Sequence, residues 1–174
     1  MILVMNMENE LQKRKKNRLS NYDYDSCGAY FLTICTSKRE NYFWDNVGAT
    51  IGRPQDIKLS PCGKIVDEAI RNIPITYSSV LLEQYVIMPD HIHLLLRIGC
   101  DEYGRPMVAP TMSRIIQQMK GYVTKRIGKS IWQKLFFDHV IRNQRDYEEH
   151  VRYIYENPIR WNIATSDCEE LMFP

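Results

Sequence analysis

The chain has 174 residues, of which 44% are hydrophobic and 25% charged, and its formal net charge is +2. These values are typical of one soluble domain with a sizeable core, and the absence of an apolar run of about 18 residues excludes a membrane-spanning helix. The small net charge gives no general signal for a nucleic-acid binder. Five scattered cysteines without a Cys-x-x-Cys motif favour free thiols in a reducing compartment, and the apolar residues at 1–5 are too few for a signal peptide. We therefore expect a cytoplasmic protein.

Basic residues are concentrated near the beginning of the chain. Residues 13–18 hold five cations in six positions, namely Lys13, Arg14, Lys15, Lys16 and Arg18. Residues 1–20 are expected to form a flexible arm, and residues 21–174 a single domain. Such an arm is most often a solvated tail, but it can also bind phosphates.

Hydrophobic periodicity predicts an alternation of strands and helices. A strand at 29–36 is followed by a loop at 45–60 and by a helix that Ser60 caps and Pro74 ends. Strands at 79–88 and 91–98 and a loop at 99–110 come next. A helix that starts at Thr111 or Ser113 runs to 127, followed by a strand at 132–142 and a helix from Asp146 to about 156, which Asn157-Pro158 ends.

This order of elements predicts the fold class. Strand, helix, strand, strand, helix, strand is the order of an α+β, ferredoxin-like split βαβ unit, with an antiparallel sheet and helices on one face. The seventh element would be an appended C-terminal helix, which carries Tyr153.

Two histidines stand at the start of the third predicted strand. Met88-Pro89-Asp90 predicts a hairpin turn, and His91 and His93 follow it two residues apart. A strand with a period of two places both imidazoles on one face, while Ile92, Leu94 and Leu96 point to the other. The pair can share a divalent metal, or the two histidines can simply be partly exposed at a strand end; the spacing alone leaves both readings open.

The last predicted helix carries a tyrosine and an amide on one face. Tyr153 and Asn157 are four residues apart, whereas Val151 and Ile154 point toward the sheet. Taken singly, Asn157 is also a common helix terminator and Tyr153 a common amphipathic edge residue.

Together these segments resemble a known family, the single-tyrosine HUH nucleases, and within it the insertion-sequence transposases and the REP-associated tyrosine transposases. The resemblance spans most of the chain. It is carried by Arg18 and by residues 22–24, 28–36, 86–94, 132–142 and 153–160, and the front and back segments are closest to the REP-associated branch.

The resemblance implies an activity and a site. His91, His93 and Asn157 match the family's ligands of Mg²⁺ or Mn²⁺, and Tyr153 matches its nucleophile, with Tyr155 a weaker candidate. The expected function is metal-dependent cleavage of single-stranded DNA near hairpins, through a 5′-phosphotyrosine, followed by strand transfer. A non-catalytic nucleic-acid-binding domain and a hydrolase that uses the two histidines and water are the alternatives. Either a monomer or a homodimer is compatible with the family.

Further cations are candidates for phosphate contacts. Lys120, Lys125 and Arg126 lie on the polar face of the helix predicted at 111–127, which is usually solvated but can follow a phosphate backbone. Arg142 and Arg160 flank the predicted tyrosine helix and are candidates for the same reason.

Overall fold

A computed structural model describes residues 27–45, 58–99 and 111–170. The basic arm, with Arg14, Lys15, Lys16 and Arg18, lies outside the described residues, as do the greater parts of the predicted loops at 45–60 and 99–110.

Four strands form one antiparallel sheet. They are β1 (Gly28–Cys35), β2 (Val80–Ile87), β3 (His91–Ile98) and β4 (Phe137–Val140), in the spatial order β2-β3-β1-β4. β2 and β3 form the predicted hairpin, in which the Met88 amide donates to the His91 carbonyl at 2.8 Å. Since β1 and β3 are adjacent in the middle, the predicted ferredoxin-like topology is confirmed.

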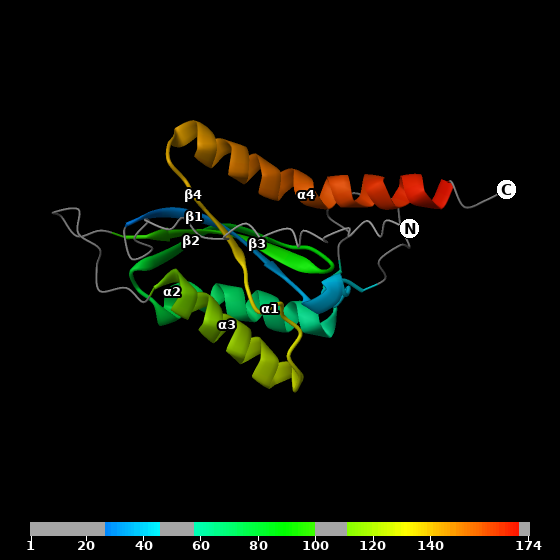
Figure 1. Cartoon of the computed structure of the whole chain (residues 1–174), viewed down its shortest axis with the longest axis horizontal. Coiled ribbons are helices and arrows are strands. Elements are labelled where there is room, and N and C mark those ends of the chain that lie inside the picture. The colour runs from blue at the N-terminus through cyan, green and yellow to red at the C-terminus, as the bar shows by residue number, and fades with distance from the viewer. Residues whose placement is uncertain (1–26, 46–57, 100–110, 171–174) are drawn as a thin grey trace, which may run out of the picture.

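Helices cover both faces of the sheet (Figure 1). α1 (Pro61–Arg71), the short α2 (Ile73–Thr76) and α3 (Met112–Ile127) lie below the sheet in this view, and α4 (Gln144–Glu170) crosses above it. A 3-10 turn, η1 (Ser37–Arg39), follows β1. The appended helix therefore occupies the face that the ferredoxin-like unit leaves open.

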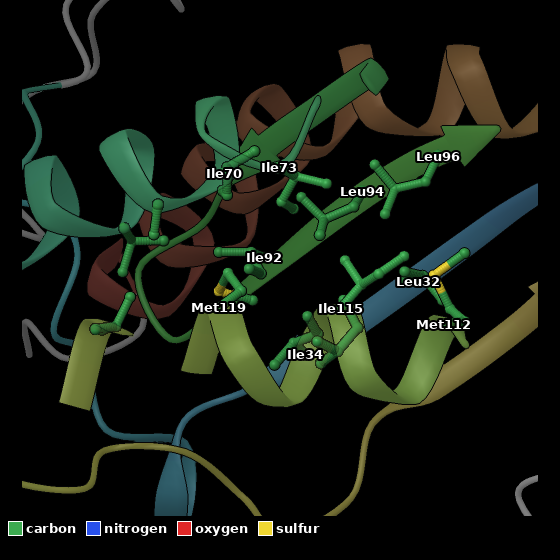
Figure 2. Close-up of a cluster of buried hydrophobic side chains, with 14 of the residues drawn as sticks. Leu32, Ile34, Ile70, Ile73, Ile92, Leu94, Leu96, Met112, Ile115 and Met119 are labelled. Atoms are coloured by element: carbon green, nitrogen blue, oxygen red, sulfur yellow. The ribbon is translucent and has the colours of Figure 1, made fainter. Parts of the chain in front are cut away.

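The main core lies between the sheet and the α1/α3 layer. Apolar side chains from β1 and β3 meet those from α1, α2 and α3, and Figure 2 shows ten of these side chains with labels: Leu32, Ile34, Ile70, Ile73, Ile92, Leu94, Leu96, Met112, Ile115 and Met119. A second, much smaller cluster joins the other face to α4 and is formed by Phe31, Leu95 and Ile154. The predicted orientation of Ile154 toward the sheet is confirmed.

Helix starts follow the local sequence. Ser60 caps α1 by accepting a hydrogen bond from the Gly63 amide at 3.0 Å, and Thr111 caps α3. Asn143 accepts a hydrogen bond from the Asp146 amide at 2.9 Å, so Asn143 is the cap of α4. The prediction that Asp146 caps this helix is wrong, because Asp146 lies within its first turn.

One predicted helix end is confirmed and one is wrong. α1 ends at Arg71, before Pro74, but Pro74 also lies in the first turn of the unpredicted α2, where a proline costs no hydrogen bond. α4 does not stop at Asn157-Pro158 but continues to Glu170 with Pro158 inside it. Proline removes one backbone hydrogen bond and bends a helix without necessarily ending it, and Figure 1 shows α4 changing direction along its length.

The fourth strand is shorter than predicted. β4 spans only Phe137–Val140, and Trp132 forms an isolated bridge to Thr36 instead of belonging to the strand. Cys27 is disulfide-bonded, contrary to the expectation of free thiols, whereas Cys35 and Cys62 are free. Within the described residues, no helix is both long and apolar enough to cross a membrane.

Candidate metal and tyrosine site

His91 and His93 lie on the α4 face of the central strand β3. His93 is opposite Thr33 in β1, and His91 is opposite Cys35. Their exposed fractions are only 5% and 3%, so the alternative of two partly exposed histidines is wrong. The neighbours Ile92 and Leu94 point into the main core, as the alternation predicts.

A continuous row of polar contacts holds the two imidazoles. His91 Nδ1 is 2.5 Å from Asp90 Oδ1, and His93 Nδ1 is 2.9 Å from Thr33 Oγ1. The Nδ1 atoms of both histidines are thereby hydrogen-bonded, and the two Nε2 atoms face each other at 3.1 Å. Arg39 closes the row with an ion pair to the second Asp90 oxygen at 2.8 Å. Fixing the outer nitrogen of a histidine in this way is how proteins orient a metal ligand.

Burial keeps both histidines neutral near pH 7. It lowers the pKa of His93 to about 3, with a further contribution from His91. Burial also lowers the pKa of His91, although Asp90 opposes that shift. Two neutral imidazoles whose Nε2 atoms converge offer two lone pairs to one point, which suits a shared cation.

Helix α4 lies over the histidines and brings Tyr153 to them. The rings of Tyr153 and His93 are in edge contact, with centroids 5.1 Å apart, and the rings of Trp161 and His91 are 6.1 Å apart. Asn157 is one helical turn from both Tyr153 and Trp161 and shares their face. From this spacing we expect Asn157 on the side of α4 that faces the histidine pair. Tyr153 is 41% exposed and accessible to a ligand.

The side chain of Asn157 tests whether these residues fit a metal. Its Nδ2 atom is buried and has no hydrogen-bond partner among the described residues, which is costly for an amide unless another group completes the site. Rotation about χ2 exchanges Oδ1 with Nδ2, so the carbonyl oxygen can occupy this buried position. Two imidazole nitrogens and one amide oxygen are a competent donor set for Mg²⁺ or Mn²⁺.

Comparison with known proteins bears on this arrangement. No protein-family model matches the chain. A REP-associated tyrosine transposase of Escherichia coli is 34% identical over 91 residues, which cover 49% of this chain and 50% of that protein. A Haemophilus influenzae protein provisionally given the same name is 25% identical and covers 82% of this chain and 77% of its own length. The predicted family resemblance is confirmed.

Two further matches cover most of the chain. An uncharacterised Haemophilus influenzae protein is 28% identical over 170 residues, covering 87% of this chain and 91% of that protein. Among solved structures, a REP-associated tyrosine transposase bound to a REP hairpin superposes with a TM-score of 0.55 at 26% identity, covering 82% of this chain and 74% of the other. These REP-associated relatives indicate a DNA-processing enzyme of the transposase type.

Several residues of the site were not predicted from the sequence. The sequence assigned Asp90 only to the turn. Its position next to His91 could have indicated a carboxylate that orients this imidazole. Thr33 and Phe31 belong to the site through the register of β1 against β3, and Phe31 stacks on His93 with centroids 5.1 Å apart. Arg39 follows β1 in a turn with φ of 59°, and only the three-dimensional structure relates it to Asp90.

The predicted phosphate-binding cations are dispersed over the molecule. Lys120 donates to the Gln133 carbonyl at 2.9 Å, and burial lowers its pKa. Lys125 and Arg126 are exposed on α3, on the far side of the sheet from α4 (Figure 1). Arg142 is exposed just before α4, and Arg160 is exposed on α4 and pairs with Glu156 at 2.6 Å. Arg142 and Arg160 thus share the histidine face of the sheet, whereas the cations of α3 do not.

Proposed function

We propose that this chain is a metal-dependent endonuclease and strand transferase that cleaves single-stranded DNA near hairpins through a 5′-phosphotyrosine at Tyr153. The observation that carries the proposal is the meeting of two elements. β3 presents two buried, neutral imidazoles with Nε2 atoms 3.1 Å apart, and α4 holds an accessible tyrosine against one of them. The REP-associated relatives, one of them bound to a REP hairpin, support the choice of DNA substrate.

His91, His93 and Asn157 would hold the ion, Mg²⁺ or Mn²⁺. When bound, a cation on three neutral ligands keeps its full charge and can stabilise the negative charge of the scissile phosphate and of the departing oxygen. Asp90 and Thr33 keep the two imidazoles in the orientation that directs both Nε2 atoms inward.

Tyr153 supplies the nucleophile. Its hydroxyl oxygen loses a proton to solvent, attacks the phosphorus and forms a tyrosine–phosphate bond. The bond from phosphorus to the 3′ oxygen breaks, and that oxygen takes up a proton from solvent and leaves as a 3′-hydroxyl. The phosphotyrosine conserves the energy of the broken bond. A 3′-hydroxyl can therefore attack it later, rejoin two strands and release Tyr153.

The site can be completed within one chain. Tyr153 lies against His93 of the same molecule, so no second copy is needed to bring the nucleophile to the ligands. We therefore propose that a monomer is competent for cleavage. Since the proposed substrate is DNA, we propose that the protein acts in the cytoplasm.

A covalent-adduct assay tests the proposal. A single-stranded hairpin oligonucleotide is incubated with the protein and Mn²⁺, and the products are separated on a denaturing gel. We expect a protein–DNA band that is absent for Tyr153→Phe and without metal but present for Tyr155→Phe, since Tyr155 is 78% exposed on the same helix and is a matched control. Cleavage without an adduct that survives Tyr153→Phe would indicate a hydrolase, and binding without cleavage a non-catalytic DNA-binding domain.

A further inference from the structure

A second cluster of metal-ligating side chains lies where β4 meets the start of α4. His139 comes from β4, and Asp146 and His150 are one turn apart on α4. His139 Nε2 is 3.0 Å from both Asp146 oxygens, and His150 Nδ1 is 3.1 Å from Oδ1. One ligand atom from each residue lies within 4.8 Å of the other two.

The donor set of this cluster differs from that of the first site. Two imidazoles and one carboxylate suit Zn²⁺ and neighbouring transition metals better than Mg²⁺. With both histidines neutral, the cluster has a charge of −1, which favours a cation. Neighbouring ligands around a tetrahedral zinc ion are about 3.3 Å apart, given bonds of about 2.0 to 2.1 Å, and the nitrogen–oxygen separations here are close to that.

Accessibility also suits an ion. The side chains of His139, Asp146 and His150 are 35%, 18% and 22% exposed, so three ligands come from the protein and an open position remains for water. The Arg142 amide donates to Asp146 Oδ2 at 3.0 Å, which orients the carboxylate.

The cluster has one feature that a cation must change. His150 Nδ1 lies 2.8 Å from the Asp146 backbone carbonyl, which only accepts, so this nitrogen carries a proton in the metal-free protein. A cation bound at Nδ1 would require that proton to move to Nε2, which gives the other neutral tautomer of His150. The two imidazoles stack with centroids 4.6 Å apart. Because protons compete with a cation for imidazole nitrogens, binding should weaken as the pH falls.

The position of the cluster indicates what an ion there would do. It ties the first two turns of α4 to β4, and His150 is three residues before Tyr153. Phe31 contacts His150, His93 and Tyr153, with ring centroids 4.6, 5.1 and 5.9 Å apart respectively. We propose that His139, Asp146 and His150 form a second divalent-cation site of the Zn²⁺ type, which fastens the tyrosine helix to the sheet. This proposal does not depend on the activity of the first site.

Metal binding without DNA tests the second site. The His91→Ala/His93→Ala protein, which lacks the first site, is titrated with Co²⁺ and followed by visible absorption, then with Zn²⁺ by calorimetry. We expect one equivalent of ion and a rise in thermal midpoint that a chelator reverses. Adding His139→Ala or Asp146→Asn should abolish both. Glu149→Gln, a change at an exposed residue of the same helix that pairs with Arg145, should alter neither of them.

Two results would overturn the second site. One is that the His91→Ala/His93→Ala protein, shown by circular dichroism to be folded, binds neither Co²⁺ nor Zn²⁺. This would mean that hydrogen bonds alone hold the three side chains together. The other is binding that persists in both His139→Ala and Asp146→Asn. Neither result bears on the adduct at Tyr153, so failure of this site and failure of the proposed function are distinguishable.

Discussion

The two faces of the sheet are made from the same strands but differ in composition. Toward α1 and α3, β1 and β3 present Leu32, Ile34, Ile92, Leu94 and Leu96, all of which belong to one large apolar cluster. Toward α4 they present Phe31, Thr33, His91 and His93, and the apolar cluster on this side has three buried members among the described residues. One face therefore supplies stability, while the other carries polar groups that are shielded from solvent because α4 covers them closely. Adjacent residues of β3, such as His93 and Leu94, therefore allow the two roles to be separated.

The largest expected effect is on activity at the α4 face. His93→Ala should abolish cleavage, a loss of at least about a thousandfold, because one of the inward-facing nitrogens is removed. His93 is buried, not at an exposed strand end, so a modest loss of stability, about 1 kcal/mol, is expected as well. Gel cleavage assays and urea denaturation measure the two quantities. Full cleavage by His93→Ala at the same metal concentration would show that His93 is not a required metal ligand.

The opposite pattern is expected one residue further along β3. Leu94→Ala removes a fully buried side chain from the main core and should lower the free energy of unfolding by about 2 to 5 kcal/mol. Where the variant remains folded, it should still cleave, since Leu94 points away from α4. Urea denaturation and cleavage at low temperature check this. A folded Leu94→Ala protein without activity would contradict the separation of the two faces.

Asn157 distinguishes a metal ligand from a simple position in a helix. Asn157→Ala should raise the Mn²⁺ concentration needed for half-maximal cleavage by about 10- to 100-fold, of the size seen when support of a metal site is lost. Asn157→Asp should lower the metal requirement but slow cleavage, because a negative ligand reduces the net charge that faces the phosphate. Metal titrations of cleavage rate measure both. Identical titrations for all variants would mean that the third ligand lies elsewhere.

The depressed pKa values predict how metal-free protein responds to acid. An unfolded histidine takes up a proton near pH 6.5, but folded His93 does so only near pH 3, so stability is retained above about pH 6.5 and declines as the pH falls toward 3. The slope for one such histidine approaches about 1.4 kcal/mol per pH unit. Urea denaturation in a chelator should show a flatter pH dependence for His91→Ala/His93→Ala. Equal slopes in the two proteins would mean that these histidines protonate normally when folded.

The smallest expected effect concerns the dispersed cations. Neutralising Arg142 and Arg160, on the α4 face, should reduce the slope of log affinity against log salt by about 0.7 for each lost phosphate contact on single-stranded DNA. The same changes at Lys125 and Arg126, on the far side of the sheet, are the comparison. A salt titration of hairpin binding measures the slopes. If only the α3 variants alter the slope, the DNA lies on the other face.

The sequence predicted most of the fold because its strongest signals are local. Alternation in β3 placed His91 and His93 together, and helical spacing placed Tyr153 with Asn157. The errors arise where a local rule has more than one outcome: Pro158 lies inside α4 instead of ending it, and Pro74, which follows the end of α1, also begins the short α2. The partners Thr33, Phe31 and Arg39 could not be predicted, since the register of β1 against β3 and the turn after β1 are set by packing across the chain.

The central claim is that Tyr153 carries the DNA during the reaction, and mass spectrometry tests it most directly. The protein is incubated with a single-stranded hairpin and Mn²⁺, denatured, and digested with nuclease and protease. Our account predicts one modified peptide, with a 5′-linked nucleotide on Tyr153. A nucleotide on Tyr155 or on any other residue, or cleaved DNA with no modified peptide, would contradict it.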